Sequence, residues 1–391
     1  MRSKLPLKFI YNVFFKTPDI IPPMLRLGLR KYLTVDWDYK RGDGISSKPP
    51  LQISLRITNL CNHRCAVCGQ YGEKGYMHTT NGKHLFNTLD VEVYKKLVDE
   101  VAYYKPLFYL TGGEPFLYPK LMELMKYIKQ KGCLATLVTN GSRLKDNAKQ
   151  IVEDGWDYVM VSLDGPEDVH DKCRGVKGAY KSAVDGLVAL RKEKETQKKA
   201  KPYILTSTTI SKVNADVLEK TFEIGNKVKP DYMIVYLSWF TSEELGKAHS
   251  KIIKKEFGIE PYTWKSYTNR YNEIELDSLV NAIKKVKEKK WPFSYLVIPN
   301  IPLKDVKDYY KYPAKMFGYS KCAAPFFMID VMPNGDVVTC RDYVDIKVGN
   351  ITEKPLLEIW NDKGFVKFRK LLIKRKGLLP ICSRCCGLMG Y

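Results

Sequence analysis

Apolar strands and amphipathic helices alternate through the middle of this chain. Between residues 51 and 240, six short segments rich in β-branched and aromatic residues are separated by segments of helical periodicity. This alternation predicts parallel βα units joined by right-handed crossovers. The expected strands are Leu51–Thr58, Leu107–Thr111, Leu134–Thr139, Tyr158–Leu163, Tyr203–Ile210 and Tyr232–Leu237, and the expected helices cover 90–104, 119–131, 144–154, 178–195 and 215–228.

Six βα units are too few for the usual eight-stranded barrel. We therefore expect an α/β fold: a partial (β/α)6 TIM-like barrel with a small C-terminal Cys-rich domain made of a hairpin and a helix. The chemistry of such a barrel gathers at the carboxyl ends of its strands. A length of 391 residues suggests two or three domains. We divide the chain into a basic arm at 1–50, the barrel at 51–240, a connecting, substrate-side region at 241–320 and the Cys-rich domain at 321–391.

A turn motif predicts the hairpin of the C-terminal domain. Met328–Met332 and Val337–Cys340 flank a Pro-Asn-Gly-Asp turn, and a helix is expected at about 355–372. The connecting region shows no clear repeat apart from a helix candidate at 276–290.

The N-terminal arm alternates basic and apolar residues, and Pro22 and Pro23 divide it into two short helical candidates. One interpretation is peripheral contact with an anionic membrane through residues 1–50. The other is an arm that packs on the main domain. Neither half is a long amphipathic helix, which favours the packed arm.

The net charge of +22 points to an acidic partner, although Lys-rich surfaces also serve solubility. The basic residues at 198–201 and 367–376 lack the interleaved aromatic residues of a nucleic-acid groove, so we expect most of them on solvated surfaces. We therefore expect no nucleic-acid partner, although the charge is compatible with a tRNA substrate. No apolar run reaches the ~18 residues of a membrane span.

Eight of the ten cysteines fall into two groups, at 61–68 and 322–386. No signal peptide opens the chain, which favours a cytoplasmic location. In that setting grouped cysteines indicate metal or redox ligands rather than disulfides. We expect Cys133 in the core and Cys173 as an inert thiol.

The first group forms a C-x3-C-x2-C loop directly after the first strand: Cys61, Cys65 and Cys68. Three thiolates leave one iron of a [4Fe–4S] cluster open, and an open iron can bind a ligand through nitrogen and oxygen. The alternative from spacing alone is a zinc site with His63 as the fourth ligand.

Polar residues flanked by glycine follow three later strands. The turns are Thr111-Gly112-Gly113-Glu114, Thr139-Asn140-Gly141-Ser142 and Ser162-Leu163-Asp164-Gly165. Glycine permits close backbone approach, and Glu114 offers an acceptor for an ammonium group. Each turn alone could be an ordinary helix cap. Three of them beside a cysteine loop predict a shared small-molecule site.

Together these motifs resemble the radical S-adenosylmethionine (SAM) superfamily, over about residues 50–240. The resemblance implies that Cys61, Cys65 and Cys68 hold a [4Fe–4S] cluster whose open iron binds SAM. It also implies reductive cleavage of SAM to a 5′-deoxyadenosyl radical that abstracts a substrate hydrogen, with an electron donor such as flavodoxin or ferredoxin. One departure is Val67, where family members commonly have an aromatic residue on the adenine side. The residues placed near SAM are Gly112, Gly113 and Glu114 at the methionine amino group, Asn140 and Ser162 at the ribose or carboxylate, and Arg174 at the carboxylate.

The second cysteine group begins with a C-x12-G-x4-C pattern that ends at Cys340. A C-x2-C pattern follows, and its first cysteine, Cys382, lies 42 positions after Cys340. Spacing alone leaves a zinc ribbon and an iron–sulfur cluster equally open. The pattern resembles the twitch domain, a short SPASM-type module of radical SAM enzymes, which implies one auxiliary [4Fe–4S] cluster. Cys386 is a spare or alternative ligand. The implied ligands are Cys322, Cys340, Cys382 and Cys385.

A fully ligated auxiliary cluster can accept an electron from a substrate radical, which suits oxidation of a small-molecule, sugar or lipid-linked substrate. One alternative is a peptide-modifying maturase, although no leader-binding domain is evident. Another is a zinc-stabilised nucleic-acid-binding protein. No general base can be assigned, because surface positions are expected for His63, His78, His84 and His170.

Overall fold

A ten-stranded sheet organises the molecule in the order β10-β9-β8-β1-β2-β3-β4-β5-β6-β7. The computed structural model describes residues 22, 25–26, 29–79, 88–268 and 273–385. Strands β1 to β7 are all parallel, which confirms the α/β fold and the partial barrel. Their bounds are β1 Gln52–Arg56, β2 Leu107–Thr111, β3 Leu134–Thr139, β4 Tyr158–Ser162, β5 Tyr203–Thr209, β6 Tyr232–Tyr236 and β7 Ser294–Ile298.

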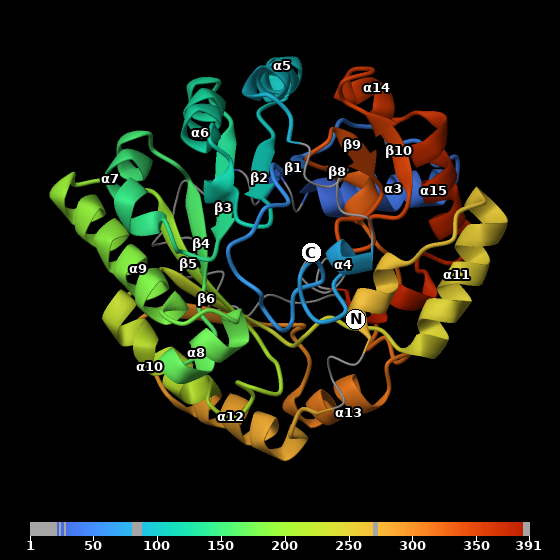
Figure 1. Ribbon diagram of the computed structural model, residues 1–391. Coiled ribbons are helices and arrows are strands. Elements are labelled where there is room, and N and C mark those ends of the chain that lie inside the picture. Colours follow the sequence, from blue (N-terminus) through green and yellow to red (C-terminus); the bar gives the residue numbers. More distant parts are fainter. Residues whose placement is uncertain (1–21, 23–24, 27–28, 80–87, 269–272, 386–391) are drawn as a thin grey trace.

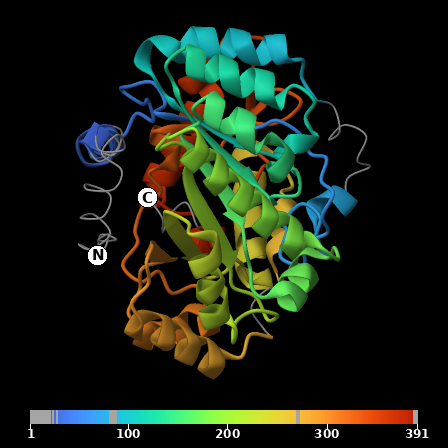
Figure 2. The same ribbon diagram turned by 90° about the vertical axis from the view of Figure 1, so that its left-hand side faces the viewer.

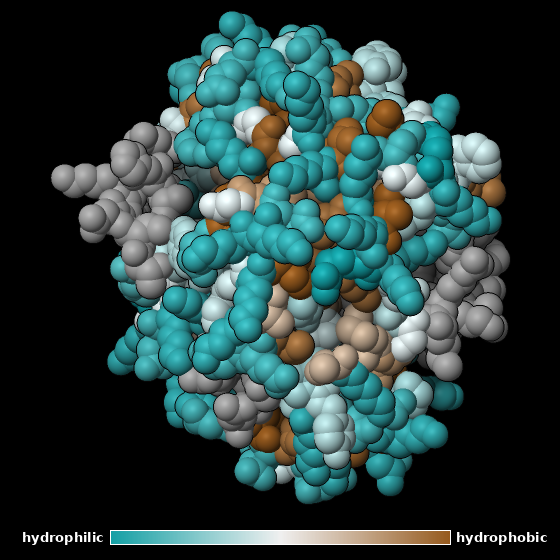
Figure 3. All heavy atoms as spheres, turned by 90° about the vertical axis from the view of Figure 1, so that its right-hand side faces the viewer, coloured by the Kyte–Doolittle hydropathy of each residue, from teal (hydrophilic) through white to brown (hydrophobic). Residues whose placement is uncertain are grey.

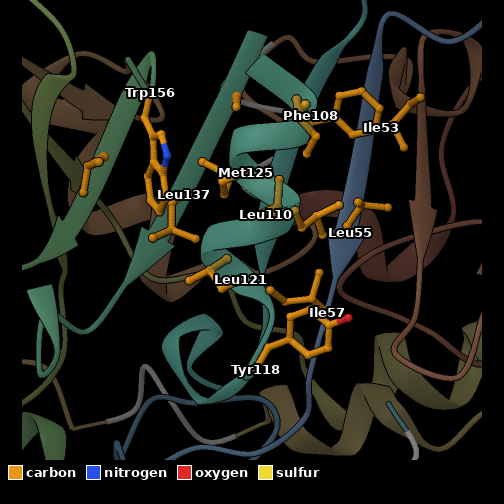
Figure 4. Packing of buried hydrophobic residues seen from close by; sticks show 14 of the residues in the cluster. Ile53, Leu55, Ile57, Phe108, Leu110, Tyr118, Leu121, Met125, Leu137 and Trp156 are labelled. Carbon is orange, nitrogen blue, oxygen red and sulfur yellow. The ribbon is translucent and has the colours of Figure 1, made fainter. Parts of the chain in front are cut away.

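Helices cover the outer side of this sheet, and the strands curve around the interior (Figure 1). Each helix packs its apolar side against the sheet. For example, Leu121 and Met125 of α6 pack against Leu110 and Leu137 of the neighbouring strands (Figure 4). The helices after β1 to β5 are α5 Val91–Val101, α6 Leu121–Gln130, α7 Leu144–Glu153, α8 Glu167–Arg174, α9 Ala179–Thr196 and α10 Leu218–Val228.

The connecting region is more regular than its sequence indicates. It contains the predicted helix and also β7, which pairs in parallel with β6 and continues the barrel sheet by one strand. Its helices are α11 Glu243–Phe257, α12 Leu276–Glu288 and α13 Val306–Lys311.

The C-terminal hairpin joins the same sheet at its other edge. Strand β8 (Met328–Val331) pairs in parallel with β1, and β9 (Asp336–Val338) and β10 (Lys347–Asn350) follow antiparallel. The prediction of a single helix at about 355–372 is wrong. The segment contains two helices, α14 (Leu356–Trp360) and α15 (Lys363–Lys374), because the Asp362 side chain caps the start of the second one.

Part of the N-terminal arm packs on this C-terminal region. A π-helical turn at Arg30–Val35 leads into α3 (Asp36–Arg41), which lies outside the barrel at the left edge of Figure 2. Most basic residues of the run at 367–376 are exposed as expected, but Arg369 is fully buried, where it donates to the carbonyls of Pro325 and Gly44.

Hydrophilic side chains cover most of the face that carries α11 and α15 (Figure 3). Among the described residues, no helix is both long and apolar enough to cross a bilayer.

Candidate functional site

The cysteine loop begins where β1 ends, at the carboxyl edge of the parallel strands. Each of its three sulfurs lies within reach of one N–H group. The backbone N–H of His63 lies 3.5 Å from Sγ of Cys61, that of Tyr71 lies 3.4 Å from Sγ of Cys68, and a guanidinium N–H of Arg174 lies 3.8 Å from Sγ of Cys65. Such donors stabilise thiolates and influence the reduction potential of a cluster that they hold.

Burial keeps the thiols of Cys61 and Cys65 protonated when no metal is bound. It raises the pKa of Cys61 to about 12, and the neighbouring thiols Cys65 and Cys68 add to the effect. Burial also raises the pKa of Cys65. Metal binding must therefore displace protons from this loop.

Position 113 needs a glycine, because its backbone lies directly against the cysteine loop. Its N–H donates to the carbonyl of Thr58 at 2.7 Å, and the next N–H, that of Glu114, donates to the carbonyl of Leu60 at 2.7 Å. A Cβ atom at Gly113 would lie 2.2 Å from the same Leu60 oxygen. The two glycines thus let the turn after β2 brace the loop through backbone hydrogen bonds.

Glu114 is buried behind this turn, and both of its carboxylate oxygens have partners. One accepts from the hydroxyl of Thr139 at 2.7 Å and from the N–H of Phe116 at 3.2 Å, and the other accepts from the N–H of Asn140 at 2.8 Å. Burial raises the pKa of this carboxyl group. Glu114 therefore joins the turns after β2 and β3, and contact with a SAM amino group stays a prediction.

The turn after β3 braces the loop from a second side. The Asn140 amide donates to Oδ1 of Asn62 at 2.8 Å, and the Asn62 amide donates to Oγ of Ser142 at 3.0 Å. Ser162 ends β4 and is half-buried. The three predicted strand ends thus lie along one edge of the sheet.

A third brace comes from the end of α8. The N–H groups of Arg64 and Ala66 donate to the carbonyls of Arg174 and Cys173, both at 3.1 Å. The Arg174 side chain also forms an ion pair with Asp164 at 2.5 Å. Arg174 is therefore bound to the cysteine loop, and its predicted contact with the SAM carboxylate stays a prediction.

Two of the four histidines expected on the surface are buried: His63 and His170. Burial, with the nearby charge of Arg174, lowers the pKa of each to about 4. Nδ1 of His170 accepts from the N–H of Asp164 at 3.0 Å, so this ring supports the turn after β4. His78 is exposed as expected, and His84 lies outside the described residues.

The second cysteine group surrounds a cavity of about 70 Å³ between the hairpin, α15 and the final turn, Pro380–Arg384. All four predicted ligands line it, and its other walls are largely apolar, including Phe368, Leu372 and Leu379. Burial raises the pKa of Cys322, Cys340 and Cys382, to about 12 for Cys382. Cys386 lies outside the described residues. The lining thiols are Cys322, Cys340, Cys382 and Cys385.

An enclosed space with four thiols fits an iron–sulfur cluster. Among the described residues, no three His, Cys, Asp or Glu side chains meet closely enough to hold one metal ion.

Two residues that position these thiols were not predicted. Gly377 has φ of +104°, accepts from the N–H of Cys322 at 3.0 Å, and would bring a Cβ atom to 2.5 Å from Lys321. Arg384, inside the C-x2-C motif, is buried and donates to the carbonyls of Tyr309, Tyr312 and Lys315, each at 2.7 Å. Its position between two ligands gives no indication of these distant partners.

A second cavity of about 70 Å³ opens inside the barrel. Its walls carry Ser54 and Arg56 of β1, Thr111 of β2, and Arg341 from the loop after Cys340. Arg341 donates to Oγ of Ser54 at 2.7 Å, and Arg56 donates to the carbonyl of Arg341 at 2.9 Å. This polar cavity was not predicted, although an arginine ending an apolar strand could have indicated it.

Three charged residues line both cavities: Asp330, Arg341 and Asp342. Sγ of Cys385 lies 3.7 Å from a carboxylate oxygen of Asp342, and burial raises the pKa of that carboxyl group. One wall therefore separates the auxiliary cysteines from the polar cavity in the barrel.

Comparison with known proteins places both cysteine groups in described families. The model of the radical SAM superfamily matches residues 55–223, and the model of the SPASM iron–sulfur cluster-binding domain matches 322–386. Fe-coproporphyrin III synthase of Methanosarcina barkeri is 27% identical over 346 residues, covering 84% of this chain and 79% of that protein. AdoMet-dependent heme synthase of the same organism is 26% identical over 350 residues, covering 85% and 88%.

A solved structure supports the same fold. Streptococcus suis SuiB bound to S-adenosylmethionine aligns with a TM-score of 0.58 at 16% identity, covering 96% of this chain and 84% of that chain.

Proposed function

Because the chain belongs to the radical SAM superfamily and carries a SPASM domain, we propose that it modifies a small polar molecule, or a polar arm of a larger one, inside the barrel. The cofactors of these two domains are SAM on a [4Fe–4S] cluster and auxiliary iron–sulfur chemistry. When bound, these groups supply a 5′-deoxyadenosyl radical for hydrogen abstraction and an acceptor for an electron.

One observation carries this proposal: the polar cavity shares a wall with the auxiliary cysteines and is lined by β1, the strand that leads into the first cysteine loop. Its floor belongs to β1, whose carboxyl end continues into the first cysteine loop. Its opposite wall is shared with the auxiliary cavity through Arg341 and Asp342. A substrate held there would meet both reactive centres while the barrel excludes water.

The cavity residues determine what this substrate can be. Two guanidinium groups and two carboxylates face a volume with room for roughly five water-sized groups. The cavity is too small for a tetrapyrrole and suits a carboxylate or hydroxyl-bearing arm. The similar proteins named as synthases of Fe-coproporphyrin III and heme make an iron porphyrin the first substrate to test.

The cysteines and the strand ends supply the rest of the site in this proposal. Cys61, Cys65 and Cys68 hold the SAM cluster, beside Gly112, Gly113, Glu114, Asn140, Ser162 and Arg174. The auxiliary cluster is held by Cys322, Cys340, Cys382 and Cys385. An electron donor such as flavodoxin or ferredoxin provides the reducing electron.

Anaerobic reconstitution with iron and sulfide tests the cofactor assignment. Two clusters predict about eight irons per chain, and replacement of the three loop cysteines by Ala predicts about four irons with no 5′-deoxyadenosine formed from SAM. Persistent cleavage of SAM in the triple variant would show that the loop is not the catalytic centre.

Absorbance titration with Fe-coproporphyrin III tests the substrate site. We expect binding by the intact enzyme and at least about tenfold weaker binding by Arg56→Gln, because a buried charge-assisted contact is lost. Tyr312→Ser, an exposed position after α13, is the matched control. No porphyrin binding, together with binding of a peptide, would instead favour a peptide maturase.

A further inference from the structure

Four large apolar side chains of the N-terminal arm are exposed to solvent. Leu25, Leu29, Leu33 and Trp37 follow one another at intervals of four residues, and each is 56–67% exposed. Single exposed apolar residues are ordinary on protein surfaces, whereas a contiguous row of them marks an interaction site. We call these four residues the apolar stripe.

The backbone keeps the stripe straight. In an α-helix, positions four residues apart drift by about 40° around the axis. The turn at Arg30–Val35 is π-helical, and because more than four residues complete a π turn, the drift between Leu29 and Leu33 runs the opposite way. Leu29, Leu33 and Trp37 therefore share one side of a segment that is about 12 Å long.

The opposite side of this segment is packed against the C-terminal region. Val35 is buried against Phe326 and Met328, and the ring of Tyr39 lies 4.6 Å from the ring of Phe326. Asp38 is fully buried and accepts from the N–H of Ser47 at 3.1 Å. The stripe is thus the outer side of a helical segment whose other side is already packed. This segment lies at the left edge of Figure 2.

Basic residues accompany the stripe. Lys40 is exposed close to Trp37, whereas the exposed Arg41 pairs with Asp38 and Asp43, and the exposed Arg26 donates to the carbonyls of Tyr104 and Lys105. Residues 1–50 carry ten Lys and Arg side chains against four Asp. A tryptophan at one end of an apolar row with flanking cations is the pattern of a helix that lies in a lipid interface. Anionic headgroups complement this charge, which is worth ~1 kcal/mol per basic residue near the surface.

A second copy of the chain fits the stripe less well. Four side chains offer only a few hundred Å² per copy, below the ~800 Å² per partner of a standard interface. Two arms of the same positive charge would also repel one another.

We propose that the apolar stripe docks the enzyme on the surface of an anionic lipid bilayer. This contact is separate from the proposed function, because no stripe residue lines either cavity. It places the rim of the auxiliary domain next to the membrane, since Tyr39 of the same segment donates to the carbonyl of Cys322 at 2.6 Å.

Vesicle flotation of the full-length, cluster-loaded protein tests the proposal. We expect flotation with vesicles of phosphatidylcholine and phosphatidylglycerol, and weaker flotation with phosphatidylcholine alone. The variant Leu29→Ser/Leu33→Ser/Trp37→Ser should lose at least about tenfold of this binding. The matched control, Val188→Ser/Tyr312→Ser, removes exposed apolar groups elsewhere and should float like the parent protein.

Iron content and cleavage of SAM should stay unchanged in the stripe variant, which separates lost docking from lost folding. Equal flotation of the stripe variant and the parent would overturn the proposal, as would a parent protein that floats with neither vesicle. A stripe-dependent dimer measured by light scattering without vesicles would also overturn it, in favour of a second copy.

Discussion

The guanidinium group of Arg174 contacts both the sulfur of Cys65, at 3.8 Å, and the carboxylate of Asp164, at 2.5 Å. The same residue accepts from the N–H of Arg64 through its carbonyl. One residue at the end of α8 therefore supports both the shape of the cysteine loop and the charge near one ligand.

Arg174→Gln should make the cluster of the first loop harder to reduce, because a positive charge beside a ligand sulfur favours the added electron. A unit charge at about 7 Å contributes ~2 kcal/mol at an effective dielectric constant of 20, and the nearby Asp164 offsets part of it. We therefore expect a fall of tens of millivolts in an anaerobic redox titration followed by electron paramagnetic resonance. Arg191→Gln, whose ion pair with Asp231 lies at the opposite edge of the sheet, is the control. An unchanged potential in Arg174→Gln would contradict this role.

Gly113→Ala should prevent assembly of the first cluster. The added Cβ atom would meet two backbone oxygens, those of Leu60 at 2.2 Å and Asn59 at 2.5 Å, and backbone cannot move aside as a flexible side chain can. We expect iron content to fall from about eight to about four per chain after reconstitution. Gly155→Ala, with φ of +66° and open space around its Cβ position, should cost only about 1 kcal/mol of stability and retain its iron. Full iron in Gly113→Ala would show that the turn can move away from the loop.

Gly377→Ala should affect the auxiliary site alone. Its φ of +104° is unfavourable for alanine, and its Cβ atom would press on the backbone next to Cys322. Loss of about four irons is expected while 5′-deoxyadenosine still forms from SAM. The control is Gly258→Ala, which also has a positive φ but no neighbour within 4 Å. Loss of both clusters would show that the two sites do not assemble independently.

Stability should decline between pH 6.5 and pH 4, partly because His170 is buried in its neutral form. Its pKa is lowered from 6.5 to about 4, so in this range the unfolded chain binds a proton that the folded chain does not. The free energy of unfolding should fall by up to about 1.4 kcal/mol per pH unit for this group. In denaturant titrations, His170→Gln should show a shallower decline, because glutamine does not bind a proton in this pH range. Glutamine can still accept from the N–H of Asp164, which preserves the local hydrogen bond. An equal slope in His170→Gln and the parent protein would contradict the assignment.

The barrel strands were predictable because buried parallel strands are continuous apolar runs of recognisable length. Predicted and observed bounds agree within two residues for each of the six strands. Strand β7 and the break between α14 and α15 were not predicted, because pairing with β6 and capping by Asp362 depend on neighbours and local geometry that periodicity does not report.

The cysteines of the candidate site were predictable, because ligands of one metal centre lie at characteristic spacings along the chain. Three thiols after a strand, and a pair of cysteines in each half of the C-terminal domain, are local patterns. The burial of His63 and His170 was not predictable, because it depends on the contact between the cysteine loop, which contains His63, and α8, which contains His170. This contact forms only in the folded chain.

By itself, the sequence determined the α/β class, the two cysteine groups and the glycines next to them, because each depends on residues close together in the chain. Only the tertiary structure decided that β8 pairs with β1, and so brings the auxiliary cysteines to the wall of the barrel cavity. It also decided which side of the N-terminal segment is packed and which side is the apolar stripe. These outcomes depend on contacts across hundreds of residues, where burial and backbone pairing, not local spacing, set the lowest free energy.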